Sequence, residues 1–215
     1  MQNGFAGMAA GAALILALTG GAVADDSTNA DLAAEARGVA QAVTAAELAA
    51  WGRARSDPGA LIMAARLLAE VPVRQGEGAA PVLTPGALLD EAAALSAGSQ
   101  PVLDAIARLR EGTRGVHNSP FGRGPIFTVK EIQARETYWF EVEARGGEVL
   151  RVAAIGDGDT NIDMAVRDAG GALLCQDGFG DHYPVCTVAP PRPGKMRVDI
   201  VNRGDVWTKV QILSN

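Results

Sequence analysis

Apolar residues in the first half of the chain recur with a helical spacing. Between residues 31 and 55 they occupy every third or fourth position and form one stripe along a helix. Proline near a capping side chain predicts three further helix starts, at Asp57-Pro58, Thr84-Pro85 and Ser99-Gln100-Pro101. Three carboxylates are predicted on solvated helix faces and not in an active site: Glu35, Glu47 and Asp104. The pattern predicts a small all-α, alanine-rich domain, with a helical repeat as the alternative because Pro-Gly-Ala-Leu occurs twice.

The apolar spacing changes to every second residue after residue 126. Apolar positions 138, 140 and 142 alternate with Trp139, Glu141 and Glu143, which is typical of a strand with one buried face. Similar short segments, separated by turns rich in glycine, proline and aspartate, give about eight strands. This number predicts an all-β, jelly-roll-like sandwich. The chain as a whole is predicted to be an α+β multidomain protein.

Composition supports a boundary between the two halves. Eight of the ten aromatic residues lie after residue 120, whereas alanine dominates the first half. We predict a signal peptide at 1–24, a helical domain at 25–111, a Gly/Pro-rich linker at 112–125 and a sandwich domain at 126–215. With 48% apolar residues the chain can bury a core. A net charge of −6 without a basic cluster excludes a nucleic-acid-binding surface.

The first residues have the features of a secretory signal. Residues 5–18 are apolar and Ala22-Val23-Ala24 forms a cleavage triplet, although no lysine or arginine precedes the apolar run. The alternative is an uncleaved anchor helix. However, a helix of this length rises only about 21 Å, less than the ~30 Å hydrocarbon core of a bilayer. The mature chain is therefore predicted to lack a transmembrane segment and to be periplasmic or secreted.

The two cysteines fit an oxidising compartment. Cys175 and Cys186 flank a glycine-containing loop that can bring two antiparallel strands together, and we predict a disulfide between them. Zinc bound together with His182 is the alternative. These residues supply at most three zinc ligands and lack paired Cys-x-x-Cys spacing, so the disulfide is favoured.

Two loops of the predicted sandwich concentrate side chains with oxygen ligands. Four of these side chains stand at every second position of one loop and two more stand between the cysteines: Asp157, Asp159, Asn161, Asp163, Asp177 and Asp181. Together they form a candidate calcium site, and Ca²⁺ is the candidate cofactor. The alternative is that they accept hydrogen bonds from the backbone of tight turns.

Aromatic side chains suggest a binding surface in the same half. The candidates are Trp139, on the polar side of its strand, and Phe179 and Tyr183, between the cysteines. The alternative is that Trp139 and Trp207 pack on an edge of the sandwich or on the helices.

The segment that contains the acidic loop resembles a known family. Residues 156–168 read Gly-Asp-Gly-Asp-Thr-Asn-Ile-Asp-Met-Ala-Val-Arg-Asp, which is similar to the "GDTDLDLYVYD" signature of bacterial pre-peptidase C-terminal domains. Gly170-Gly171 and Ala189-Pro190-Pro191 follow in the family's order, and the resemblance covers residues 124–215. It implies a β-sandwich accessory module of the kind attached to secreted proteases, which aids secretion, is removed in maturation or binds polymeric substrates. Some relatives bind calcium.

These features predict an exported, non-enzymatic binding or accessory protein whose sandwich contacts an envelope protein or an extracellular polymer. No catalytic residue is predicted, because the two histidines, His117 and His182, stand outside any nucleophile motif. The alternative is a protease-associated maturation factor or hydrolase with a site at the domain interface. A cleft that places one of these histidines within hydrogen-bond reach of a carboxylate and a serine would favour the alternative.

Overall fold

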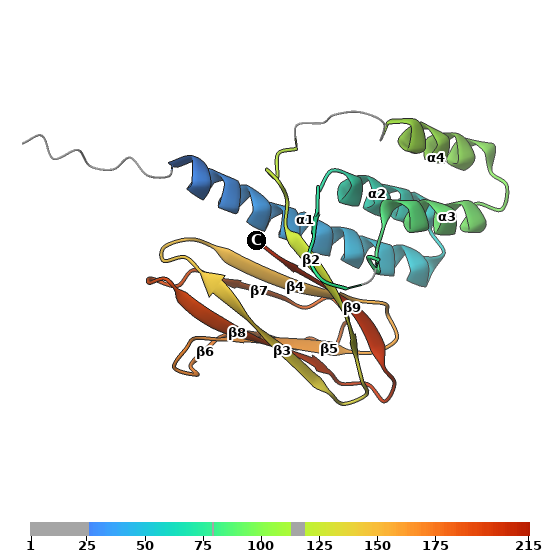
Figure 1. The fold of residues 1–215 in the computed structure, drawn as a ribbon. Coiled ribbons are helices and arrows are strands. Elements are labelled where there is room, and N and C mark those ends of the chain that lie inside the picture. Colours follow the sequence, from blue (N-terminus) through green and yellow to red (C-terminus); the bar gives the residue numbers. More distant parts are fainter. Residues whose placement is uncertain (1–25, 79, 113–118) are drawn as a thin grey trace, which may run out of the picture.

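Four helices form the N-terminal half (Figure 1). The computed structural model describes residues 26–78, 80–112 and 119–215, so the predicted signal peptide, His117 and part of the predicted linker lie outside the described residues. The helices are α1 (Asp26–Arg55), α2 (Pro58–Ala69), α3 (Pro85–Leu95) and α4 (Gln100–Gly112). No helix of the described chain combines the length and the apolar character needed to cross a membrane.

Capping side chains fix the helix starts where the sequence predicts them. Oδ1 of Asp57 accepts hydrogen bonds from the backbone N–H groups of Gly59 (2.8 Å) and Ala60 (3.1 Å) at the start of α2. Oγ1 of Thr84 accepts one from the N–H of Ala87 (3.1 Å) at the start of α3. These bonds satisfy donors that the first helical turn leaves unpaired.

The C-terminal half is a β-sandwich of two sheets. Sheet A has the order β1-β2-β9-β4-β7 and sheet B the order β3-β8-β5-β6. The strands are β1 (Arg74–Gln75), β2 (Ile126–Ile132), β3 (Thr137–Ala144), β4 (Leu150–Gly156), β5 (Ile162–Arg167), β6 (Leu173–Asp177), β7 (Val185–Val188), β8 (Gly194–Asn202) and β9 (Thr208–Ser214). The predicted fold class, a helical part followed by a β-sandwich, is confirmed. The additional strand, β1, comes from the helical half and pairs in parallel with β2.

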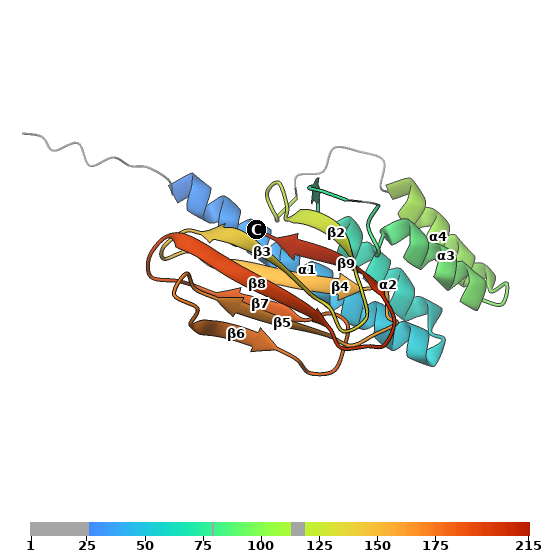
Figure 2. The same cartoon turned by 60° about the horizontal axis from the view of Figure 1, so that its bottom comes forward.

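Helices, sheet A and sheet B form three layers (Figures 1 and 2). One hydrophobic cluster lies between the helices and sheet A, and includes Phe127, Ile155 and Leu213 from the sheet. A second cluster fills the space between the two sheets. The predicted helical and sandwich domains thus share a hydrophobic cluster, and the boundary at 112–125 remains a prediction.

Glu35 is buried, so its predicted place on a solvated face is wrong. Only 3% of the residue is exposed, and its Oε2 accepts a hydrogen bond from Nη2 of Arg74 at 2.8 Å. Nε of Arg74 also donates to the carbonyl of Gly124 (2.9 Å). The side of α1 that carries Glu35 faces β1 and the segment before β2, which the helical pattern alone does not reveal. The ion pair therefore ties the first helix to sheet A.

The predicted disulfide between Cys175 and Cys186 is confirmed, with a Cα–Cα distance of 5.8 Å. The two cysteines stand on β6 and β7, which are edge strands of different sheets and not neighbours in one hairpin. The disulfide therefore joins sheet A to sheet B along one open edge of the sandwich.

Removing the disulfide by the double substitution Cys175→Ser and Cys186→Ser is expected to lower the free energy of unfolding by about 2–3 kcal/mol, because the unfolded chain gains the entropy of an unclosed loop. Urea denaturation of the variant and of the oxidised parent measures the difference. A change within ~0.5 kcal/mol would contradict a stabilising role.

Glu35→Ala is expected to lower the free energy of unfolding by about 3 kcal/mol, because Arg74 loses its buried partner and the carboxylate leaves a gap between α1 and β1. Glu47→Ala is the matched control, since Glu47 is an exposed carboxylate on the same helix. Its effect should stay within ~0.5 kcal/mol. Equal losses in both variants would show that the ion pair is not what stabilises this contact.

Candidate binding surface

The outer face of sheet B is the sheet surface that the helices leave open. Figure 2 shows the helices together on the sheet A side. Along β3 the side chains of Tyr138, Phe140 and Val142 pack toward the core between the sheets, whereas those of the alternate residues are exposed: Trp139, Glu141 and Glu143. The strand period predicted for this segment is therefore correct, and it places Trp139 on the open face.

Trp139 is held on this face by a charged neighbour. The residue is 52% exposed, and the guanidinium carbon of Arg197 lies 4.7 Å from the centre of its ring. Nε of Arg197 in turn donates to Oδ1 of Asp199 at 2.8 Å, and Nε of Arg167 lies 3.6 Å from the other oxygen of Asp199. The indole and the Asp199 carboxylate therefore belong to one connected group with limited rotational freedom.

A row of four residues crosses the sheet at this point. Trp139 pairs with Asp199, Asp199 with Ala165, and Ala165 with Gln176, so the row runs over β3, β8, β5 and β6. Residues directly opposite each other in a sheet point to the same side, and three strand spacings cover about 14 Å. We call this row the Trp139 strip. Ala165 stands between Asp199 and Gln176 in this row, and its methyl group rises less far from the sheet than the side chains on either side of it.

Charges around the Trp139 strip are paired. Nζ of Lys195 donates to Oε2 of Glu141 at 2.8 Å, and this carboxylate raises the pKa of Lys195 above its ordinary value. Nε of Arg203, just after β8, donates to Oδ2 of Asp163 at 2.6 Å. The open face therefore offers many hydrogen-bonding groups without a strong excess of either charge.

The structure separates the three aromatic residues that the sequence groups into one binding surface. Phe179 is 91% exposed in the loop after β6, which is the edge strand opposite β3 in sheet B. Tyr183 is partly buried against the cluster between the helices and sheet A, and its ring makes an edge contact with His182. Trp207, in the loop between β8 and β9, is 52% exposed like Trp139. Of the predicted set, Trp139 is the residue on the open sheet face.

The carboxylates of the candidate calcium site accept hydrogen bonds from several different elements. Asp157 accepts from Oγ1 of Thr208 (2.7 Å) and from the N–H of Lys209 (3.0 Å), both on β9. The Asp177 carboxylate accepts from the N–H of Val185 (2.8 Å), and Oδ1 of Asp181 from the N–H of Tyr183 (3.1 Å). Such bonds are the turn-stabilising role that the sequence leaves as the alternative.

Several of the candidate ligands come from adjoining segments. Asp163 and Asp177 stand on the paired strands β5 and β6, and the N–H of Ile162, beside Asn161 and Asp163, donates to the carbonyl of Asp181 at 2.8 Å. Oδ1 of Asn161, Asp163 and Asp177 is buried without a hydrogen-bond partner, while Asp159 is exposed. Within residues 26–78, 80–112 and 119–215, no three His, Cys, Asp or Glu side chains are grouped to hold a metal ion. Calcium binding remains a prediction.

His182 lies in a small cavity between the helices and sheet A. The cavity has a volume of about 220 Å³ and is lined by Ala46, Arg53, Val82, Leu83, Glu91, Ile155, Gly156, Asp157 and His182. Arg53 donates two hydrogen bonds of 2.7 Å to the carboxylate of Glu91. Burial lowers the pKa of His182 below its ordinary value, although Asp181 and Asp157 act in the opposite direction. Among the described residues that line this cavity there is no serine or cysteine to serve as nucleophile.

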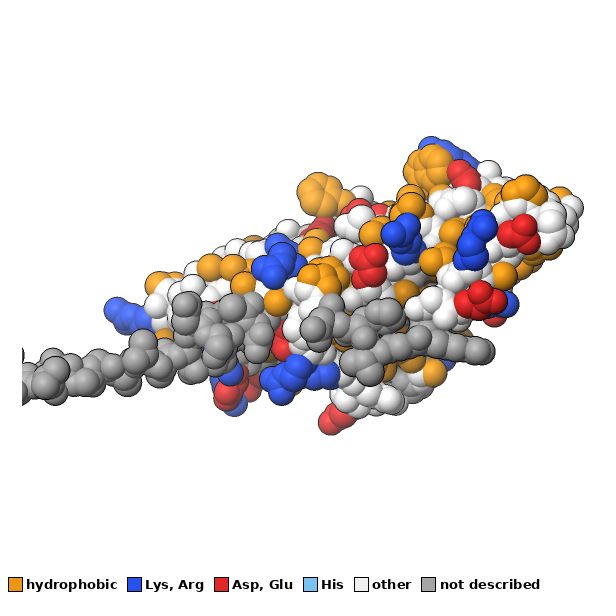
Figure 3. Space-filling model, turned by 90° about the horizontal axis from the view of Figure 1, so that it is seen from above, with side chains coloured by type: hydrophobic (Ala, Val, Ile, Leu, Met, Phe, Trp, Pro, Cys, Tyr) orange, Lys and Arg blue, Asp and Glu red, His pale blue; other side chains and the backbone are white. Residues whose placement is uncertain are grey.

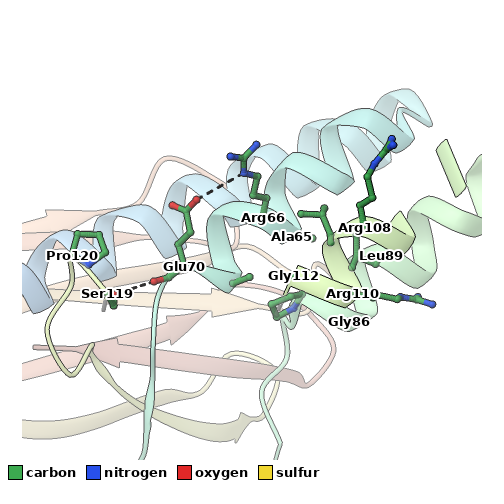
Figure 4. Close-up of a pocket in the computed structure, with 13 residues that line it drawn as sticks. Ala65, Arg66, Glu70, Gly86, Leu89, Arg108, Arg110, Gly112, Ser119 and Pro120 are labelled. Atoms are coloured by element: carbon green, nitrogen blue, oxygen red, sulfur yellow. Dashed lines mark hydrogen bonds and ion pairs between the residues drawn. The ribbon is translucent and has the colours of Figure 1, made fainter. Parts of the chain in front are cut away.

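A larger cavity, of about 580 Å³, lies among α2, α3, α4 and the segment before β2 (Figure 4). Ala65 and Leu89 contribute apolar surface, and Arg66 lies 3.9 Å from the carboxylate of Glu70. The hydroxyl of Ser119 donates to the backbone carbonyl of Glu70 at 3.1 Å, so it fixes the chain before β2 against α2. Figure 3 shows the helix-side surface, where basic and acidic side chains are interspersed among apolar ones.

Comparisons with known proteins add little to this picture. No protein-family model matches the sequence, and no curated protein matches it. A solved de novo designed double-stranded β-helix shares 18% identity, with 41% of this chain and 97% of that chain covered and a TM-score of 0.26. The periplasmic g-type lysozyme inhibitor PliG of Aeromonas hydrophila shares 16% identity, with 42% and 86% covered and a TM-score of 0.31.

A carbohydrate-binding module from Cellvibrio mixtus lichenase 5A, solved with cellotriose, shares 13% identity, with 39% of this chain and 72% of that chain covered and a TM-score of 0.28. Scores at this level carry no argument about function. The β-sandwich itself is shown by the structure, and the resemblance to pre-peptidase C-terminal domains remains a prediction.

The lowered pKa of His182 has a consequence for stability. The unfolded chain binds a proton at His182 near pH 6.5, and the folded chain binds it only at lower pH, so acidification below about pH 6.5 favours unfolding. We compare the unfolding free energy of the parent with that of His182→Gln. The parent's value minus the variant's is expected to decrease as the pH is lowered from about 7.5 to about 5. Urea denaturation at the two pH values measures this difference, and a constant or rising difference would contradict the burial of a neutral imidazole.

Proposed function

We propose that this protein is an exported binding module that contacts an envelope protein or an extracellular polymer through the outer face of sheet B. The observation that carries the proposal is Trp139, half exposed on a sheet face that none of the helices α1 to α4 in the described residues covers. Tryptophan contributes more than most residues to binding when a partner covers it, because its large apolar surface loses little side-chain entropy. The pairing with Arg197 restricts the indole before a partner arrives.

Export is supported by the disulfide and by the predicted signal peptide. Disulfides persist in periplasmic and extracellular proteins and are rare in the reducing cytosol. The bond between Cys175 and Cys186 also ties the edge of sheet B to sheet A. A sheet fixed in this way supports a rigid contact surface at low entropic cost.

A binding role is favoured over the hydrolase alternative by the two cavities described above. His182 has carboxylates nearby, but the described lining of its cavity supplies no hydroxyl or thiol nucleophile. The hydroxyl of Thr208, which is close to Asp157, donates its hydrogen bond to that carboxylate. In the larger cavity the Ser119 hydroxyl is bonded to a backbone carbonyl. Neither arrangement matches a nucleophile paired with a base.

Trp139→Ala is expected to reduce co-sedimentation of the folded protein with the envelope fraction of the producing cell by about tenfold, because a central apolar contact is lost. Trp207→Ala is the matched control, since Trp207 is equally exposed but lies in a loop. Circular dichroism confirms that both variants are folded. Unchanged sedimentation of Trp139→Ala, or an equal loss with Trp207→Ala, would refute this contact surface.

A further inference from the structure

We propose that the partner of the outer face of sheet B is an uncharged carbohydrate polymer, which binds along the Trp139 strip. This inference rests on the proposed function and adds the chemical class of the ligand. The strip places a half-exposed indole, a carboxylate flanked by two arginines, an alanine and an amide in one line across four strands.

The aromatic end of the strip matches one face of a sugar ring. Pyranose rings present C–H groups on their faces, and these pack on aromatic rings by burying apolar area against the π-system. Arg197 lies over the Trp139 ring at 4.7 Å, and 52% of the residue still remains open to solvent. A ring stacked on the exposed indole would lie directly beside Asp199 in the same row.

The polar part of the strip matches sugar hydroxyls, which both donate and accept hydrogen bonds. The Gln176 amide offers a carbonyl acceptor and an N–H donor, and it is exposed at the far end of the row. Only 14% of the Asp199 side chain is exposed, because its carboxylate lies between Arg197 and Arg167. It therefore fixes these two arginines, whose exposed guanidinium groups can donate hydrogen bonds to sugar hydroxyls. Ala165, between these groups, has no long side chain that would obstruct a chain lying across the sheet.

The charge balance of the face selects an uncharged ligand over a charged one. Four acidic residues lie on the face or at its end, and four basic residues accompany them: Glu141, Glu143, Asp163, Asp199, Lys195, Arg197, Arg167 and Arg203. Most of these charges are paired at 2.6–3.6 Å. A surface without net charge does not concentrate a polyanion or a polycation by electrostatic attraction.

The distribution of apolar side chains favours a saccharide over a protein. Large exposed apolar residues on sheet B strands are Trp139 on one edge strand and Leu173 and Leu174 on the opposite edge strand, among the described residues. The charged strands β8 and β5 lie between them. Protein interfaces of ordinary size are built around a contiguous buried apolar centre, which this face lacks.

The test is binding to an array of neutral oligosaccharides (cello-, chito-, laminari-, xylo- and manno-oligosaccharides) with heparin and polygalacturonate as anionic probes. We expect the full-length exported protein to bind at least one neutral series. We also expect about tenfold weaker binding for Trp139→Ala and weaker binding for Gln176→Ala, while Trp207→Ala should bind like the parent. The affinity should survive 1 M sodium chloride, where the Debye length is only ~3 Å.

Two results would overturn the inference: no binding to any neutral series, or binding only to the anionic probes with loss in salt. Envelope co-sedimentation of Trp139→Ala tests the proposed contact surface independently of the carbohydrate assay. If Trp139→Ala abolishes envelope co-sedimentation while no neutral saccharide binds, the outer face is the contact surface and its partner is not an uncharged carbohydrate. If Trp139→Ala has no effect in either assay, both proposals fail.

Discussion

Sheet A has apolar side chains on both of its faces, and each face needs a covering layer. Its central strands β4 and β9 contribute Ile155 and Leu213 to the cluster under the helices, and Val152 and Ile212 to the cluster between the sheets. Burying apolar area on both sides of one sheet is the main favourable contribution to such a fold. The helical layer, with α1 lying against β4 and β9, and sheet B are the two covers of this layer (Figure 1).

This constraint explains why one sheet face stays open. The helices pack against the outer face of sheet A. Sheet B buries its inner face against sheet A, and its outer face is left exposed to solvent. An ion pair and a disulfide are among the contacts that hold the layers together. The ion pair of Glu35 with Arg74 joins α1 to β1, and the disulfide joins β6 to β7. The strands of sheet B are therefore restrained by their packing against sheet A and by the disulfide, and the outer face of sheet B is carried by this restrained backbone.

Local sequence signals predicted much of the secondary structure. The capping residues Asp57 and Thr84 start helices where expected, because a cap depends on contacts within a few residues. The alternation along β3 placed Trp139 outward, because side chains in a strand alternate in direction. The cysteine pair was predictable from loop length and composition, although the sequence did not reveal that its strands belong to different sheets. The strand β1 was missed because it has only two residues and gains its stability from pairing with β2.

The sequence by itself determined the local elements, the disulfide partners and the outward direction of Trp139, since these follow from periodicity and short-range chemistry. The tertiary structure decided which residues of distant segments meet. It buried Glu35 against Arg74 and aligned Trp139, Asp199, Ala165 and Gln176 in one row. The reason is strand order: non-sequential neighbours such as β3 and β8, or β4 and β9, come together through the packing of the sheets, which no local pattern encodes.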